Sequence, residues 1–330
     1  MTTMLMKDVL PAWTPGTPVG HRNLTLVPLR GEGHQQRFQD YMLACEAIEA
    51  GLLKITEVDE SGSVPELLAV NDADRPVLLI DGEEFQGAKQ NRIMNTTVLL
   101  RPRSKTRIPV SCVEEGRWSQ TTSVFRSGNY APSSLRQRKS RDVQHSLRAR
   151  GRAESDQGAV WDSVAEHIEA HAAQSPTRAM SDAMGTLGEA LERYRDAFPY
   201  PSGACGVVAA VCGRFVAMDT FDSPSTLEAI WSRLVASYAM DAETTPDKTQ
   251  KHFTAKAAGV LVAHVSEQSC QAFSAVGLGD DLRFEAADVL GQALRADRHL
   301  LHLSVFPPSS NQPDIQNPGL SISPPSRRRR

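Results

Sequence analysis

The sequence has few cysteines, no apolar run long enough to cross a membrane, and little excess charge. Its five cysteines are an odd number, contain no CxxC pair and form no tight cluster with histidine, which argues against a disulfide framework and against a zinc site. No stretch approaches the ~20 apolar residues of a transmembrane helix. The first residues, with Lys7, Asp8, Pro11 and Pro15, lack the apolar core of a signal peptide. These absences predict a cytoplasmic protein with free thiols and no membrane contact.

The net charge of −3 excludes a nucleic-acid binder that works through the charge of the whole molecule, and we expect no nucleic-acid partner. The charge is unevenly placed, however. Thirteen Lys and Arg residues lie between Arg101 and Arg152, against the three acids Glu114, Glu115 and Asp142. This basic segment either attracts phosphates or is a solvated face that balances an acidic remainder, and both interpretations stay open.

The common signatures of cofactor and metal sites are missing. The sequence has no GxGxxG after a predicted strand, no GK[ST] phosphate loop, no HExxH and no GxSxG. It therefore indicates no particular cofactor and no metal. His302 alternates with leucines on a predicted strand, which favours a surface or hydrogen-bonded histidine over a ligand.

The order of apolar patterns predicts an α+β protein, with a β-rich N-terminal unit, central helices and a mixed α/β C-terminal part. Short apolar runs separated by turn residues fill residues 21–125. Residues 126–156 are polar, and they predict a linker that is either a long loop or a polar helix across Ser134 to Arg150. Residues 157–306 combine helical periodicity with short alternating runs, and we expect one domain over residues 21–306.

The two ends of the chain look different from this domain. Residues 1–20 are rich in Pro, Gly and Thr, which predicts a flexible lead-in. Residues 307–330 are rich in Pro and Ser and finish in four arginines, which predicts a disordered tail.

Three local patterns predict individual elements. Cys205 to Met218 is expected to be a hairpin that turns near Cys212 and Gly213. A helix is expected to begin at Pro224, with Ser223 as its cap. Asp219 and Asp222 bracket the turn into that helix and are expected to cap it. A stripe at helical spacing predicts a core or interface face and comprises Met180, Met184, Leu187, Leu191, Tyr194 and Phe198.

The densest polar stretch, Asp81 to Arg92, lies between two apolar runs and is expected to be a loop. It supplies the carboxylates of Glu83 and Glu84 together with two cations and three amides, a mixture that suits a polar molecule carrying hydroxyls and phosphates. The alternative is an internal hydrogen-bond network that bridges two strands. The cations and amides of this stretch are Lys89, Arg92, Gln86, Gln90 and Asn91.

A second polar stretch follows Cys112. Arg117 and Trp118 suit a clamp for a phosphate and a stacking surface for a base, although the tryptophan would serve equally to cap the core. Glu114 stands beside them, and acids near Cys112 make that thiol a poor nucleophile, so we expect a structural cysteine. In an antiparallel sheet alternate loops meet at one end, so we expect Lys89 or Arg92 near Arg117.

Three strings give the chain a family resemblance: GEEFQGAKQNRIMNTTVLL, IPVSCVEEGRW and GRFVAMDTFDSPSTLEAIWSRLVASYAMDA. They resemble the ARG (ADP-ribosylglycohydrolase) and Rhodanese-Phosphatase-superfamily-associated protein domain over about residues 20–306. The family name refers to gene neighbours, so the resemblance implies a role near ADP-ribose or phosphorylated nucleotide metabolism. The residues carried over as site candidates are Glu83, Glu84, Gln86, Lys89, Gln90, Asn91, Arg92, Glu114, Arg117 and Trp118.

Two hypotheses follow. In the first, the chain binds or processes a phosphorylated ribose-containing ligand: Lys89, Arg92 and Arg117 hold phosphate, while Glu83 or Glu84 binds ribose hydroxyls or acts as a general base. In the second, the chain is a non-catalytic partner or scaffold for a neighbouring enzyme, and it docks or self-associates through helices within residues 159–198.

Overall fold

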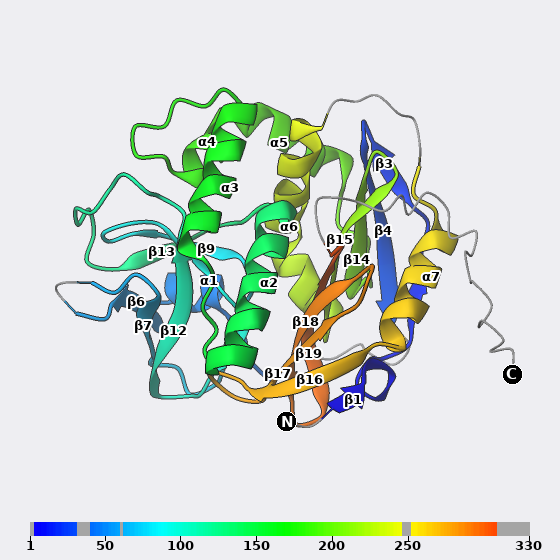
Figure 1. The fold of residues 1–330 in the computed structure, drawn as a ribbon, viewed down its shortest axis with the longest axis horizontal. Helices are drawn as coiled ribbons and strands as arrows, with labels where there is room; N and C mark the ends of the chain where they lie inside the picture. Colours follow the sequence, from blue (N-terminus) through cyan, green and yellow to red (C-terminus); the bar gives the residue numbers. More distant parts are fainter. Residues whose placement is uncertain (1–2, 32–39, 60–61, 246–251, 309–330) are drawn as a thin grey trace, which may run out of the picture.

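The structure is a computed structural model that describes residues 3–31, 40–59, 62–245 and 252–308. The described chain forms three β-sheets and seven α-helices, which confirms the α+β fold class. The six-stranded sheet lies on one side, the largest sheet on the other, and α2, α3 and α6 between them (Figure 1).

The largest sheet is antiparallel and draws its strands from both ends of the described chain. The strand order is β1-β16-β17-β18-β19-β15-β14-β4-β2, and β3 also pairs with β4. The predicted hairpin is confirmed, because β14 and β15 are joined by a turn in which Cys212 and Gly213 both have positive φ. The strands are β1 (Thr3–Leu5), β2 (Trp13–Pro15), β3 (Val19–His21), β4 (Leu24–Gly31), β14 (Gly206–Val211), β15 (Arg214–Phe221), β16 (Ser269–Ser274), β17 (Asp280–Glu285), β18 (Leu290–Ala296) and β19 (His299–Phe306).

The first strands of this sheet come from the segment that we expected to be a flexible lead-in. That expectation does not describe residues 3–20, because Met6 and Trp13 are buried in the apolar core beneath the large sheet. A short 3-10 helix, Met6–Asp8, joins β1 to the following residues.

The two smaller sheets come entirely from residues 42–130, which confirms the β-rich N-terminal unit. Their strand orders are β13-β9-β10-β12-β7-β6 and β11-β8-β5. Within the stretch that we expected to be a loop, β9 and β10 form an antiparallel hairpin. The strands are β5 (Met42–Leu43), β6 (Leu53–Glu57), β7 (Glu66–Asn71), β8 (Val77–Leu79), β9 (Glu83–Gly87), β10 (Arg92–Met94), β11 (Val98–Leu100), β12 (Ser104–Cys112) and β13 (Phe125–Tyr130).

Among the helices, α1 packs against strands of the smaller sheets, α5 packs on α6, and α7 lies against β2 at the outer edge (Figure 1). The polar segment before residue 151 is a helix, α2, and not a loop. Ser223 caps α6 as predicted, since its hydroxyl accepts from the amide of Thr226 at 3.3 Å. The helices are α1 (Ala44–Glu49), α2 (Ser133–Arg150), α3 (Gln157–Ala170), α4 (Met180–Thr186), α5 (Gly188–Ala197), α6 (Pro224–Thr244) and α7 (Ala255–Ser266).

The helical stripe from Met180 to Phe198 belongs to the core. It is divided between α4 and α5, and Met180, Leu191 and Tyr194 are almost fully buried in the largest apolar cluster. The structure therefore contradicts our expectation of a docking face on this stripe, because its apolar side chains are already covered by the same chain.

None of the helices in the described ranges is both long and apolar enough to span a membrane. The tail prediction for residues 307–330 falls largely on residues 309–330, which lie outside the described part of the chain.

Candidate functional site

The β9–β10 hairpin distributes the candidate residues over two faces of a sheet. Arg92 pairs with Cys112 across β12, while Ile93 pairs with Glu84 on β9. Side chains alternate along a strand, so Arg92 and Glu84 point to opposite faces. The hairpin therefore separates Glu84 from the buried arginine of the polar stretch.

Glu83 is buried and forms an ion pair with Arg233 of α6, with 3.5 Å between Oε1 and Nη1. Ser127 also donates to this carboxylate at 3.3 Å. Burial raises the pKa of Glu83, and Arg233 counteracts this only in part. Glu83 thus joins the smaller sheet to α6.

Glu84 is buried beneath β13. Its Oε2 accepts from the Gln86 side chain at 2.8 Å and from the Asn129 amide at 3.4 Å, while Oε1 has no hydrogen-bond donor within the described ranges. A Cβ at Gly128 would lie 2.7 Å from Oε2, so any larger residue at this position would have to displace the Glu84 carboxylate. Burial raises the pKa of Glu84 to about 7, because the two hydrogen bonds do not offset the loss of hydration.

Arg117 and Glu114 fasten the second polar stretch to the hairpin turn. Arg117 donates to both carboxylate oxygens of Glu114, at 2.8 and 2.6 Å, and to the carbonyl of Ala88 at 2.6 Å. The backbone N–H of Asn91 donates to the Glu114 carboxylate at 3.0 Å. Burial opposes ionisation of Glu114, but Arg117 and the other donors outweigh it and lower its pKa. The Arg117 guanidinium therefore donates its hydrogen bonds to protein groups, as in the internal network that we considered as the alternative to a ligand site.

Lys89, Arg92 and Trp118 meet at the turn end of the β9–β10 hairpin. The Trp118 side chain is 48% exposed, and its ring centroid lies 5.3 Å from Lys89 Nζ and 5.7 Å from Arg92 Cζ. Both distances are those of cation–π contacts. The expected proximity of the two polar stretches is thus found, although the cations face Trp118 while Arg117 is turned to the backbone.

Arg92 is fully buried at this end of the hairpin. It donates from Nη1 to Gln90 Oε1 at 2.8 Å and to Cys112 Sγ at 2.6 Å. Its Nε and Nη2 have no hydrogen-bond acceptor among the residues described, and the carboxylate of Glu57 lies 3.9 Å from Nη2. Burial raises the pKa of Cys112 to about 11 despite Arg92, which supports a structural thiol.

Sequence reasoning missed Glu57, which stands at the end of β6 and accepts from the Lys89 amide at 3.3 Å. No local signal marked it, because it lies 35 residues before Arg92 in the chain. We call Glu57, Lys89, Arg92 and Trp118 the Trp118 corner. The remaining candidates have other partners: Gln86 accepts from Arg126, Gln90 donates to the Glu115 carbonyl, and Asn91 donates to Ser181.

A second group of charged residues, also missed, is buried between α2 and the large sheet. Arg136 pairs with Asp219 of β15, and Lys139 pairs with Asp81 and donates to the Asn95 carbonyl. The side chains of both cations and both acids are 1% exposed or less. Asp219, expected as a helix cap, is therefore held in the interior.

The buried group is continued by hydrogen bonds to β19 and α6. His302 lies 2.7 Å from the Thr97 hydroxyl and 3.2 Å from that of Ser304, so it is the hydrogen-bonded histidine that we predicted. Tyr238 and Ser304 both donate to Asp219. Burial would raise the pKa of Asp219, but Arg136 and His302 hold it well below its usual range.

The basic segment from Arg101 to Arg152 is divided among several acids. Arg136 and Lys139 form the buried ion pairs with Asp219 and Asp81, and Arg141 and Arg148 both pair with Glu285. The structure thus favours charge balance over a phosphate-attracting patch. The other pairs from this segment are Arg103–Asp74, Arg107–Glu66, Arg117–Glu114, Arg138–Glu166, Arg150–Glu154 and Arg152–Glu154.

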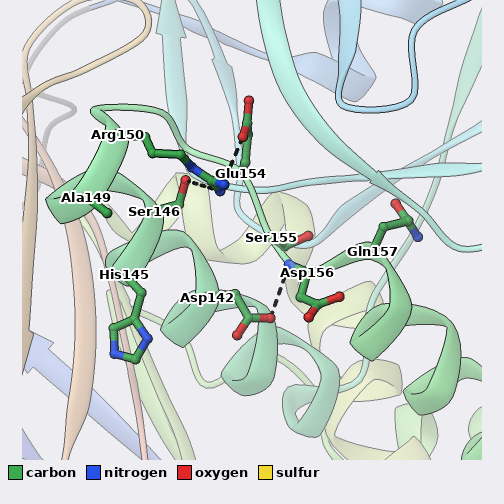
Figure 2. A pocket seen from close by; sticks show the side chains of 9 residues that line it. All are labelled: Asp142, His145, Ser146, Ala149, Arg150, Glu154, Ser155, Asp156 and Gln157. Carbon is green, nitrogen blue, oxygen red and sulfur yellow. Dashed lines mark hydrogen bonds and ion pairs between the residues drawn. The ribbon is translucent and has the colours of Figure 1, made fainter.

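An open pocket of about 530 Å³ lies between the C-terminal half of α2 and the residues that lead into α3 (Figure 2). It contains none of the candidate residues of the sequence. Its lining comprises Asp142, His145, Ser146, Ala149, Arg150, Glu154, Ser155, Asp156 and Gln157.

Within the described ranges no group of three or more His, Cys, Asp or Glu side chains is arranged to hold a metal ion. Among known proteins, the family model of the ARG and Rhodanese-Phosphatase-superfamily-associated Protein domain matches residues 13–306. No curated protein and no solved structure matches the chain.

Proposed function

The chain belongs to the ARG and Rhodanese-Phosphatase-superfamily-associated protein domain family, and from this premise we propose that it binds a phosphorylated, ribose-containing ligand at the Trp118 corner. The family description associates the domain with ARG and with rhodanese-phosphatase proteins. With ARG read as ADP-ribosylglycohydrolase, the ligand class is ADP-ribose or a nucleotide.

The observation that carries this proposal is the buried guanidinium of Arg92. Two of its nitrogens have no hydrogen-bond acceptor among the described residues. An unsatisfied buried donor costs about 1–3 kcal/mol, and more when it is charged. Phosphate oxygens are suitable acceptors because they match the fork of a guanidinium.

The neighbouring side chains supply the other parts of such a site. Lys89 adds a second cation beside Trp118. The exposed indole offers a stacking surface for a base, a contact worth about 1–3 kcal/mol in nucleic-acid sites. Glu57 provides a carboxylate for ribose hydroxyls, the role that we had assigned to Glu83 or Glu84.

We propose binding and not catalysis at this corner. Glu84 lies on the opposite face of the hairpin from Arg92, and Glu83 is paired with Arg233. Neither acid is positioned by these contacts to act on a ligand that Arg92 and Trp118 hold.

Titration of ADP-ribose and ADP against the wild-type chain, followed by calorimetry and by tryptophan fluorescence, tests the proposal. We expect saturable binding, quenching that is lost in Trp118→Phe, and at least tenfold weaker binding in Lys89→Ala. Lys105→Ala, which removes an exposed cation from β12, is the matched control. Absence of binding by the wild-type chain to either compound, or equal binding by Lys89→Ala and Lys105→Ala, would refute the proposal.

As a second candidate we propose a non-catalytic partner that docks on an enzyme through the same side of the β-rich unit. Trp118, Val64 and Val124 are more than a third exposed, and the loop that contains Val64 passes close to Trp118, since a Cβ built on Gly62 would lie 3.4 Å from the indole ring. Copurification with a tagged rhodanese-phosphatase protein, lost in Trp118→Ala without loss of thermal stability, would support this role. Binding of ADP-ribose with no protein complex would favour the first.

A further inference from the structure

The gap between Arg92 and Glu57 in the Trp118 corner is wider than direct pairing of the two residues would make it. Glu57 Oε2 lies 3.9 Å from Arg92 Nη2, which is beyond the length of a hydrogen bond. Both atoms are buried, and neither has a hydrogen-bond partner among the residues that the structure describes. We propose, on the premise of the proposed function, that a ribose hydroxyl of the ligand fills this gap, so that the site selects ribonucleotides over deoxyribonucleotides.

The guanidinium of Arg92 has an N–H group to spare for such a hydroxyl. A guanidinium carries five N–H groups, and the two on Nη1 are directed to Gln90 Oε1 and to Cys112 Sγ. Nε and Nη2 provide the other three, and they have no acceptor in the described part of the chain. A phosphate bound side-on takes the Nε–H and one Nη2–H. The second Nη2–H therefore remains for another acceptor.

The carboxylate of Glu57 needs a donor at the same place. Its Oε1 accepts from the backbone N–H of Lys89 at 3.3 Å, whereas Oε2 receives no hydrogen bond from the described residues. A group that satisfies both side chains must donate to Glu57 and accept from Arg92 at once. A hydroxyl does both, while an ionised phosphate oxygen has no proton to donate and an ammonium group has no lone pair to accept.

The width of the gap suits a single oxygen atom. A hydroxyl oxygen at hydrogen-bond distances of about 2.7–2.9 Å from each atom spans a separation of 3.9 Å. The indole of Trp118 borders the same place, because a Cβ built on Gly62 would lie 3.5 Å from Glu57 Oε2 and 3.4 Å from the ring. Ribose is bonded directly to its base, so a nucleotide whose base stacks on Trp118 has its sugar beside this gap.

Calorimetric titration of the full chain with ADP, 2′-deoxy-ADP and 3′-deoxy-ADP tests the proposal. We expect ADP to bind at least tenfold more tightly than one or both deoxy analogues, because the missing hydroxyl leaves buried polar groups of the site unpaired. The three compounds carry the same base and the same phosphates, so the difference in affinity reports the hydroxyl alone.

The variant Glu57→Ala assigns the preference to this gap. It removes the acceptor of the hydroxyl proton, so the preference for ADP over the deoxy analogues should shrink severalfold. Glu66→Ala is the matched control and should keep the wild-type preference, since it removes a 41% exposed acid from the neighbouring strand β7. Thermal unfolding of both variants establishes that they are folded. If Glu57→Ala does not fold, the three nucleotides compared on the wild-type chain decide alone.

The outcomes separate this inference from the proposed function. Equal binding of ADP and both deoxy analogues would overturn the inference and leave the proposed function standing, with water and not the ligand in the gap. An undiminished preference in a folded Glu57→Ala would overturn it as well, because other residues would then recognise the hydroxyl. Absence of ADP binding also overturns it, and absence of binding of both ADP and ADP-ribose overturns the proposed function too.

Discussion

The guanidinium of Arg136 on α2 holds the carboxylate of Asp219 on β15 through two nitrogen–oxygen contacts, the longer of them 3.1 Å. Both side chains are buried, and Ser304 and Tyr238 donate to the same carboxylate. Two of the structural layers are therefore joined by a charged pair in the interior.

Removal of one partner of this pair should strongly reduce the stability of the folded protein. We expect Asp219→Ala to lower the free energy of unfolding by about 3–5 kcal/mol, because it leaves Arg136 buried without its counter-charge. Urea unfolding followed by circular dichroism measures the change. The double variant Arg136→Met with Asp219→Ala should recover part of the loss. A single variant within ~1 kcal/mol of the wild type would show that the pair is not buried as described.

Arg117 and Lys89 should behave differently when each is replaced by alanine. Arg117 is largely buried and bonded to Glu114, so Arg117→Ala should cost about 3 kcal/mol of unfolding free energy. The cation–π contact of Lys89 with the exposed Trp118 is worth about 0.5–1 kcal/mol, so Lys89→Ala should unfold almost like the wild type. The two unfolding midpoints decide the matter, and equal losses would contradict the distinction between a structural and a binding cation.

Glu84 should make stability fall as the pH rises from about 4.5 to 7. Its folded pKa is raised, so the folded state binds the proton more tightly; the stabilisation is complete below the unfolded pKa and is lost as the pH passes the folded value. The loss should reach roughly 3 kcal/mol, since each pKa unit corresponds to about 1.4 kcal/mol.

The comparison of Glu84→Gln with the wild type at pH 5 and pH 8 isolates this effect. Glutamine stays neutral, so the variant should gain stability relative to the wild type at pH 8 but not at pH 5. Glu49→Gln, at an exposed position of α1, is the matched control and should change neither value. A Glu84→Gln variant whose difference from the wild type is the same at both pH values would contradict the raised pKa.

Deletion of residues 309–330 should leave the melting temperature nearly unchanged. The described chain reaches residue 308, and the carbonyl of Pro307 accepts from Gln137, so the deletion keeps that contact. The prediction rests on the composition of the tail, which offers little apolar surface to bury. Differential scanning calorimetry of the shortened chain checks it, and a decrease of several degrees would indicate that the tail is docked.

The sequence by itself determined the local elements. The fold class, the hairpin at Cys212 and Gly213 and the cap at Ser223 all follow from turn chemistry and apolar periodicity, whereas periodicity left open whether the stripe from Met180 to Phe198 is core or interface. Each of these signals lies within a few neighbouring residues, so it can be recognised in the sequence without knowledge of the fold. The family membership followed from three strings of the same local kind.

The tertiary structure alone decided which polar residues meet. Glu83 and Glu84 are adjacent in the chain, yet one binds Arg233 and the other lies beneath β13. Arg136 and Asp219 are 83 residues apart and share one buried pair. Periodicity states which face of an element is apolar, but a buried charge finds its partner only when separate elements pack together, because desolvation makes an unpaired charge too costly to keep.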